Sequence, residues 1–463
     1  MAIVSFVMRI IRINYTDNGY PVFDEKHYVS QAHDMLYNGG LENNPGYGLV
    51  VHPPLGKYLL SVGIDVFGYT PLGWRIVSVL AGITVVLCTM LIIQRITKSL
   101  SIAVLAGILI NIEGVVFVMS RMGMLDSFLA AGVSLIAACL VMEYTKDRTN
   151  TPFHQHWWLL TAGILCGLTM SIKISGVYYA AFAGVFMVLF YAIKSKSAKT
   201  TLRSFGVGLV YFFILPVATF LMTYVPWFAS ENSVYRHTIE STTDTQDFPQ
   251  WLSWMPESFQ NFFYYQLGVL KFHSGLHTDP TSLHPWESHS WQWSIGERPM
   301  VFYSSVNADN KLENIWLLGN LSIWWLFIPV VALSIIRLCM KDWKWIIVLG
   351  GFTTGYLPWL IMHERQSYFF YVTPLAMFLV TGIVFAIYDI SSVVKKRSGL
   401  QFNKVFWSIA TPYAAAVTIF FTIYTPWYYG IGISEEHHDT LTLFSSWEPL
   451  ESISIEQTVN QQE

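Results

Sequence analysis

The chain has 463 residues, of which 53% are hydrophobic and only 12% are charged. This charged fraction is about half that of an ordinary soluble domain, so the composition is typical of a membrane protein with many spans. The net charge of −3 gives no sign of a nucleic-acid partner. The four cysteines are scattered without CxxC spacing, which excludes a disulfide framework or a cysteine-based metal knuckle.

Apolar runs that could cross a bilayer, about 20 residues each, recur along the chain. We predict such spans at residues 72–94, 100–119, 124–144, 157–174, 176–193, 201–225, 315–338, 343–361, 367–388 and 404–426. Residues 1–13 form a shortened first segment, because a helix of that length rises only about 20 Å. We interpret it as a late start or trimmed terminus. A cleaved signal peptide is the competing interpretation, but Arg9 and Arg12 interrupt the run. The sequence predicts an all-α polytopic membrane protein with about eleven transmembrane helices.

Lysine and arginine are concentrated in alternate loops. Short cytoplasmic loops hold an excess of these residues, so we predict a cytoplasmic amino end and an extracytoplasmic carboxyl end. The basic loops contain Arg95 and Lys98; Lys146 and Arg148; Lys194, Lys196, Lys199 and Arg203; Arg337, Lys341 and Lys344; and Lys395, Lys396, Arg397 and Lys404.

Two segments on the opposite, outer side are too long to be simple turns, and loops of such length are usually functional. They cover residues 14–71 and 226–314. We therefore divide the chain into a transmembrane catalytic module, a large extracytoplasmic loop, carboxyl-terminal transmembrane helices and an acidic outer tail. Their bounds are 1–225, 226–314, 315–428 and 429–463.

The first outer segment contains the adjacent carboxylates Asp24 and Glu25. Taken alone, such a pair is an ordinary solvated turn; at a membrane surface it could supply the base for sugar transfer. The motif HPPLGKY follows from His52, and the apolar residues of Leu55 to Phe67 have helical spacing. We predict a helix there that lies along the membrane interface.

Several ionisable residues lie within or at the ends of the predicted spans. Such residues are costly in a bilayer and usually face a cavity or one another, although a single Lys or Arg can extend to the interface. All except Glu113 lie near outer ends, which favours a shared anionic ligand such as a lipid phosphate. The set comprises Arg75, Glu113, Arg121, Asp126, Lys173 and Arg365.

The second outer segment is rich in histidine and tryptophan, in the motifs FHSGLH (272–277) and HPWESHSWQW (284–293). A zinc site is disfavoured, because Gly275 interrupts the His273 and His277 pair and no third ligand has suitable spacing. The mixture suits the wall of a sugar site, where aromatic faces stack and imidazoles form hydrogen bonds. A tryptophan-rich interfacial belt is the alternative.

The ordered motifs resemble those of the bacterial protein O-mannosyltransferases, which belong to the GT-C class of membrane glycosyltransferases. The resemblance runs from the first segment to the tenth span, and residues 226–314 have no room for the β-trefoil MIR insertion of the fungal and animal proteins. It rests on FDEKHY, HPPLGKY, GWRIVSVLAG, SRMGMLD, GLTMSIKISG, FHSGL, HPWESHSWQW, LLGNLSIWW and YLPWL followed by RQSYFFYVTP.

The resemblance implies inverting transfer of mannose from polyprenyl-phosphate mannose to serine or threonine of exported proteins. Asp24 corresponds to the base and Glu25 to its partner in ordering the site. We predict that Arg75, Lys173, Arg365, Arg121 and Arg9 bind the lipid phosphate. His52, His273, His284 and Trp291 are predicted to line the sugar or acceptor side, while Glu113 and Asp126 are predicted to be structural partners of Arg121 or of other helix residues.

The predicted partners are the donor lipid, the acceptor proteins, which could be met at the export translocon, and the bilayer of the bacterial plasma membrane. No cofactor or metal site is required by the sequence, and assistance by a divalent ion is left open. A GT-C enzyme that acts on a glycolipid or cell-wall glycan would suit the same acids and cations. An oligosaccharyltransferase is disfavoured because WWDYG is absent, and a transporter because no internal repeat is visible.

Overall fold

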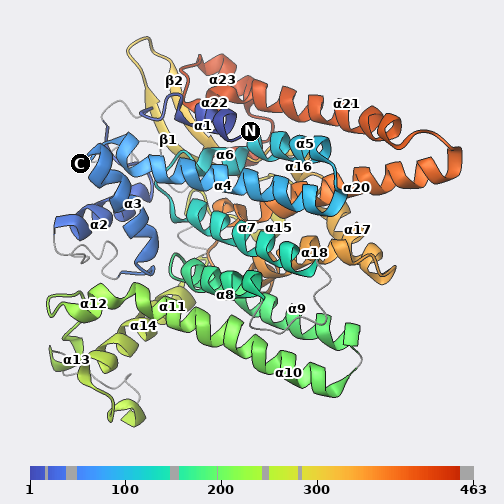
Figure 1. Ribbon diagram of the computed structural model, residues 1–463. Coiled ribbons are helices and arrows are strands. Elements are labelled where there is room, and N and C mark those ends of the chain that lie inside the picture. The colour runs from blue at the N-terminus through green and yellow to red at the C-terminus, as the bar shows by residue number, and fades with distance from the viewer. Residues whose placement is uncertain are drawn as a thin grey trace.

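The protein is helical almost throughout (Figure 1). The computed structural model describes residues 1–15, 19–37, 50–145, 156–195, 197–241, 250–279 and 284–448. Within this part, one antiparallel hairpin, β1 (Met300–Val306) with β2 (Leu312–Leu317), interrupts the helices. The predicted all-α membrane class is confirmed.

Long apolar helices form the body of the molecule and run roughly side by side (Figure 1). Of the described residues, seven helical stretches are long and apolar enough to cross a membrane. The number eleven stays a prediction, because other segments are short or broken. The helices are α1 (Ala2–Ile10), α4 (Pro71–Thr97), α5 (Leu100–Asn111), α6 (Gly114–Met119), α7 (Leu125–Tyr144), α8 (Trp157–Met170), α9 (Val177–Ser195), α10 (Ala198–Leu209), α11 (Leu215–Thr223), α16 (Leu321–Trp324), α17 (Phe327–Cys339), α18 (Ile346–Gly355), α19 (Leu357–Ile361), α20 (Leu375–Ser398) and α21 (Phe402–Ile423).

Several predicted spans differ from the structure at their ends or interiors; the run 343–361, for example, is divided between α18 and α19. The run 315–338 begins in strand β2, and helix starts only at Leu321, because a short apolar run fits a buried strand as well as a helix. The run 367–388 begins as the 3-10 helix η6 (Phe369–Val372), and α20 starts after Pro374. The run 100–119 is broken before Gly114, where Glu113 caps α6.

The shorter elements gather at one end of the long helices (Figure 1). The predicted helix from Leu55 to Phe67 is confirmed as α3. The α9–α10 and α20–α21 connections lie at the opposite end (Figure 1). The other short elements are α2 (Glu25–Tyr37), the 3-10 helix η2 (Ile174–Gly176), α12 (Val225–Ala229), α13 (Thr238–Ser241), η4 (Gln250–Leu252), α14 (Glu257–Gly275), α15 (Ser290–Trp293), α22 (Thr425–Tyr429), α23 (Glu435–Leu441) and η7 (Ser445–Trp447). Lys146, Arg148, Lys196 and the tail beyond residue 448 lie outside the described residues.

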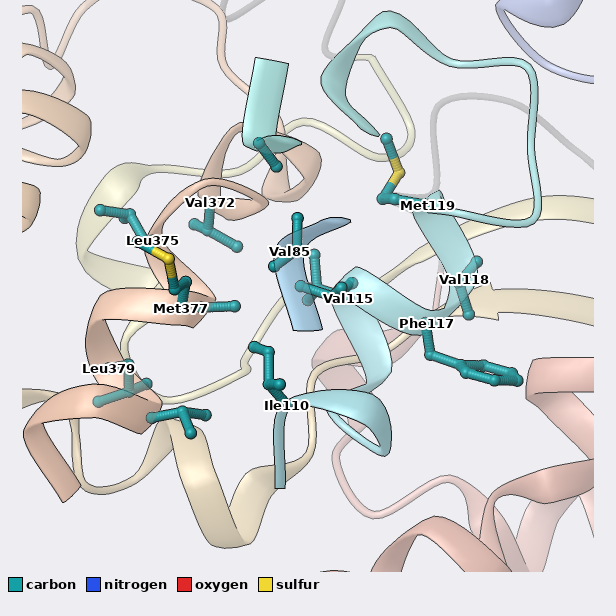
Figure 2. Close-up of a cluster of buried hydrophobic side chains, with 14 of the residues drawn as sticks. Val85, Ile110, Val115, Phe117, Val118, Met119, Val372, Leu375, Met377 and Leu379 are labelled. Carbon is teal, nitrogen blue, oxygen red and sulfur yellow. The ribbon is translucent and has the colours of Figure 1, made fainter. Parts of the chain in front are cut away.

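The main core joins the amino-terminal and carboxyl-terminal helices. Figure 2 shows Val85 of α4, Ile110 of α5 and Val115 of α6 opposite Met377 and Leu379 of α20. All these side chains are at most 2% exposed. Some polar side chains are also buried among these helices, including Glu113 at the start of α6 and Thr381 of α20.

Candidate active site

Asp24 lies at a sharp bend just before α2. The preceding residue, Phe23, has φ +51°, a left-handed conformation that is uncommon for a bulky residue and often marks a functional site. The Asp24 carbonyl accepts the amide hydrogen bonds of His27 and Tyr28, at 3.1 and 3.2 Å. The bend therefore fixes where the first helical turn and its two acids are placed.

Glu25 is completely buried and held on both carboxylate oxygens. Arg75 donates from Nε to Oε1 (2.8 Å) and from Nη2 to Oε2 (2.7 Å). The amide of Gly123 donates to Oε1 (2.7 Å), and that of Val22 to Oε2 (3.0 Å). These four donors occupy the four lone-pair sites with which a carboxylate accepts hydrogen bonds. Glu25 is thereby a fixed anchor that ties the bend to α4 and to the loop before α7.

Asp24 has a different environment. Its carboxylate accepts one long hydrogen bond, from Tyr28 Oη at 3.5 Å, and forms no ion pair with a cation of the described chain. Burial raises its pKa to about 6, against the lowering effect of the nearby Lys173 charge, while Asp126 adds a raising effect. A carboxylate with such a pKa is ionised at neutral pH and is a stronger base than a solvated aspartate.

Lys173 lies at the start of η2 and forms a buried ion pair. Its Nζ donates to both oxygens of Asp126, at 2.9 and 2.8 Å. The same ammonium group lies 5.3 and 5.6 Å from the ring centroids of Phe370 and Tyr371. Asp126 therefore pairs with Lys173, and Arg121 has other partners. The pair tunes Asp24 electrostatically from a short distance.

Arg365 keeps donor capacity that the protein does not use. Its Nε donates to the His273 carbonyl (3.2 Å), and its Nη2 lies 3.4 Å from His273 Nδ1. Its guanidinium lies over the rings of Trp359 and Tyr371, at 5.0 and 5.8 Å. The remaining nitrogen, Nη1, is buried and has no hydrogen-bond partner in the part of the chain that the structure describes. A buried cationic donor without a hydrogen-bond acceptor costs folding free energy unless a ligand supplies the acceptor.

His52 and His273 form a stacked pair, with ring centroids 5.4 Å apart. His273 Nε2 bonds to the Val51 carbonyl at 2.9 Å, whereas the buried His52 Nδ1 has no hydrogen-bond partner among the described residues. Burial lowers the pKa of both imidazoles, and nearby cations lower it further. Both rings are therefore neutral at pH 7 and can donate or accept hydrogen bonds. His52 also lies 5.8 Å from Tyr28, ring to ring, which brings the pair next to Asp24.

Three other predicted phosphate ligands direct their donors at the protein. Besides binding Glu25, Arg75 donates to the Ile13 carbonyl at 2.7 Å. Arg9 donates to Ser120 Oγ (2.7 Å) and Asn111 Oδ1 (2.5 Å), while its buried Nη2 has no partner among the described residues. Arg121 donates to carbonyls at the end of α1, including those of Arg9 (2.9 Å) and Ile11 (2.7 Å). All three are fully or almost fully buried, so their contacts fasten α1 to the body of the protein.

The remaining predicted residues lie apart from this cluster or have structural contacts. Glu113 caps α6 through the amides of Val115 and Val116 and accepts Trp324 Nε1 at 2.8 Å. His284 packs against Tyr368, with ring centroids 5.1 Å apart. Trp291 is 53% exposed on α15 and has no described contact with Asp24. No group of three potential metal ligands occurs among the residues that the structure describes.

Sequence reasoning missed the aromatic residues that hold the site. Phe23 stacks on Phe302 of β1, with centroids 4.7 Å apart, and meets Phe370 edge-on at 6.1 Å. Tyr28 is the one contact that could have been found, because it lies four residues after Asp24, where side chains on a helical turn meet. The pairing of Phe23 with Phe302, 279 positions later, leaves no local signal.

The fold and the site together define a polytopic membrane glycosyltransferase of the GT-C type. Two solved structures share the fold. One is the Saccharomyces cerevisiae Pmt1-Pmt2 protein O-mannosyltransferase complex bound to the sugar donor, with TM-score 0.77, 15% identity, and coverage of 99% of this chain and 94% of that chain. The other is ArnT from Cupriavidus metallidurans bound to undecaprenyl phosphate, with TM-score 0.54, 15% identity, and coverage of 92% and 76%.

Sequence comparison narrows the class to one family. Residues 1–230 match the dolichyl-phosphate-mannose-protein mannosyltransferase family, and residues 258–447 match the C-terminal four-transmembrane region of protein-O-mannosyltransferase. The polyprenol-phosphate-mannose--protein mannosyltransferase of Corynebacterium glutamicum is 35% identical over 96% of this chain and 92% of its own length. The Mycobacterium tuberculosis protein of the same name is 32% identical over 96% and 90%. The chain belongs to the protein O-mannosyltransferase family.

Proposed function

We propose that this enzyme transfers mannose from polyprenyl-phosphate mannose to serine or threonine hydroxyls of exported proteins, with inversion at the anomeric carbon. The observation that carries the proposal is the contrast between the two adjacent acids. Glu25 is saturated with protein donors, while Asp24 has one weak partner and a pKa raised to about 6. A partly buried acid that pairs with no cation of the described chain is suited to accept a proton.

The proposed step is a single displacement. The acceptor hydroxyl oxygen forms a bond to the anomeric carbon as the bond from that carbon to the phosphate oxygen breaks. Asp24 takes the hydroxyl proton, and the electron pair leaves with the polyprenyl phosphate. Because the anomeric centre gains oxocarbenium character, removing the proton as the new bond forms prevents a second positive charge on the acceptor oxygen.

Arg365 is the cation that we assign to the leaving phosphate. The rings of Trp359 and Tyr371 hold its guanidinium group in a fixed position. Its Nη1, unpartnered within the described residues, is a donor available to a ligand. Fixed positive charge acts where negative charge grows in the transition state. We assign Lys173 to tuning Asp24, and Arg75, Arg9 and Arg121 to holding the scaffold, in place of direct phosphate binding. The neutral His52 then bonds to a sugar hydroxyl through Nδ1.

We further propose that the site faces the outside of a bacterial plasma membrane. The basic last turn of α20, with Lys395, Lys396 and Arg397, lies at the end of the helices opposite α2 and α3 (Figure 1), and basic loops favour the cytoplasm. Asp24 would then meet exported chains as they emerge from the export translocon. His284 and the exposed Trp291 border that outer side and are proposed acceptor contacts.

The test uses membranes that contain the protein, radiolabelled polyprenyl-phosphate mannose and a peptide rich in serine and threonine. The native protein is expected to label the peptide, and Asp24→Asn to label almost none. Asp34→Asn on the same helix is the matched control and should retain activity. Equal labelling by the native protein and Asp24→Asn would contradict the base assignment. Label recovered only in lipid would show a glycolipid acceptor.

A further inference from the structure

Helix α14 exposes an apolar stripe along its whole length. Phe259, Phe263, Leu267 and Leu270 are 42%, 36%, 39% and 52% exposed. Their spacing of four, four and three residues places them on one helical face. A face of this kind on a helix surrounded by water would be an unexplained apolar patch.

The opposite face of α14 is also apolar and is packed. Phe262, Tyr265 and Val269 are buried in a cluster with Tyr224 and Trp227. The polar Asn261 lies inside, fully buried, and its Oδ1 accepts the amide hydrogen bond of Ile239 at 2.9 Å. An amphipathic helix at an aqueous surface buries its apolar residues and exposes its polar ones. Helix α14 therefore has an environment on its exposed side that is not water.

The exposed stripe is continuous with the lipid-facing surface of the α10–α11 span. Phe259 contacts Phe228, at the end of α12, with ring centroids 5.1 Å apart, and Figure 1 shows α14 beside α11 and α12. Met222 and Val225, where that span ends, are 72% and 56% exposed. The span qualifies as a membrane helix by length and composition, so its bare apolar side faces acyl chains.

Two tryptophans extend the same surface just before α14. Trp251 and Trp254 are 73% and 74% exposed. Tryptophan is enriched where acyl chains meet headgroups, because its ring is apolar and its N–H is polar. Helix α14 itself contains Glu257 and Lys271 near its ends and is not among the apolar helices that could span. Its composition suits the interface plane.

We propose that α14 lies in the outer membrane interface, with the stripe Phe259, Phe263, Leu267 and Leu270 in contact with lipid. The occupant of this face is thus the bilayer itself. The consequence reaches the active site, because the last turn of α14 contains His273, whose carbonyl and ring contact Arg365. The depth at which the helix sits in the leaflet then sets the position of the proposed phosphate-binding arginine.

Spin labels on single cysteines test the proposal in lipid nanodiscs of phosphatidylethanolamine and phosphatidylglycerol. The exposed Cys339 is first replaced by Ser, and labels are placed by Phe263→Cys, Leu267→Cys and, as an aqueous control, Asp309→Cys in the hairpin turn. Labels on α14 are expected to collide severalfold more with oxygen than with a water-soluble nickel complex. The Asp309→Cys label is expected to show the reverse.

Two results would overturn the proposal. Nickel accessibility at Leu267→Cys equal to that at Asp309→Cys would place the stripe in water. Nickel accessibility that disappears when a peptide rich in serine and threonine is added would identify an acceptor-docking surface. Trp254→Cys provides a second site whose side chain is mostly exposed and whose replacement disturbs little packing. Because collision rates are measured without turnover, failure here is distinguishable from failure of the proposed transfer activity.

Discussion

The buried pair of Arg75 and Glu25 gives the sharpest test of how the two acids divide their roles. Arg75→Met removes the cation but keeps most of the side-chain volume. The structure predicts that Glu25 is then left charged and buried, with only the amides of Gly123 and Val22 as donors. The Ile13 carbonyl also loses its 2.7 Å partner. Both losses act on the fold, so we expect a stability defect.

The expected magnitude is about 3 kcal/mol of lost stability, at the lower end of the usual cost of breaking a buried ion pair, because two donors to Glu25 remain. The measurement is the apparent Tm of the detergent-purified protein, together with binding of polyprenyl-phosphate mannose. Arg397→Met is the matched control, since Arg397 is exposed in the last turn of α20, and it should leave Tm unchanged.

The double variant Arg75→Met with Glu25→Met separates pairing from catalysis. Replacing both charges by apolar side chains removes the orphaned carboxylate, so Tm should recover toward the native value. Transfer activity should stay low, because the bend that carries Asp24 loses its anchor. An unchanged Tm in Arg75→Met, with donor binding alone weakened, would refute this reasoning and restore Arg75 as a phosphate ligand.

Three further outcomes are expected. The pKa of Asp24 is raised to about 6, and a base must be unprotonated to act. We therefore expect kcat/KM to fall about tenfold for each pH unit below 6 and to be flat above it. A pH profile without a break near 6 would contradict the role of Asp24 as the base. Arg365→Ala should lower kcat/KM for the donor by about a hundredfold, because a charged hydrogen bond contributes up to about 3 kcal/mol. Arg365→Lys should recover part of this loss. Native kinetics in Arg365→Ala would refute the assignment of Arg365 to the phosphate. Phe302→Leu should remove about 1 kcal/mol of ring stacking with Phe23, which corresponds to a roughly fivefold loss in kcat at unchanged donor KM. Val306→Ala on the same strand should leave kcat unchanged. Equal effects of the two substitutions on kcat would show a general defect of the hairpin.

The features that depend on local composition could be predicted from the sequence. Helix α3 has the bounds expected from its spacing, because Pro53 and Pro54 stop any preceding helix and the apolar period of Leu55 to Phe67 requires a packed or interfacial face. The long helices likewise follow from apolar runs that a bilayer selects. The hairpin did not follow, since residues 315–317 of β2 are apolar and were assigned to the start of a span.

The partners of the buried charges could not be predicted, because they depend on tertiary packing. Arg75 and Glu25 are separated by 50 positions, and Lys173 and Asp126 by 47. In the sequence, Arg75, Lys173 and Arg365 were equal first candidates for phosphate ligands, since each lay near an outer span end. The structure distinguishes them by what each donor already contacts. Among the described residues, Arg9 and Arg365 each keep an unpartnered nitrogen, but only Arg365 lies beside the histidine pair.

The same principle explains why adjacent acids have opposite roles. Consecutive residues at the start of a helix project about 100° apart, so Glu25 can enter the protein toward Arg75 while Asp24 contacts Tyr28 and is influenced by the charge of Lys173. If Arg75 paired with Asp24, the ion pair would lower the pKa of that carboxylate and weaken it as a base. Because Lys173 is already neutralised by Asp126, Asp24 keeps a raised pKa within a cationic surrounding. Its basicity thus arises from its desolvated surroundings, and the charge of Lys173 offsets that effect only in part.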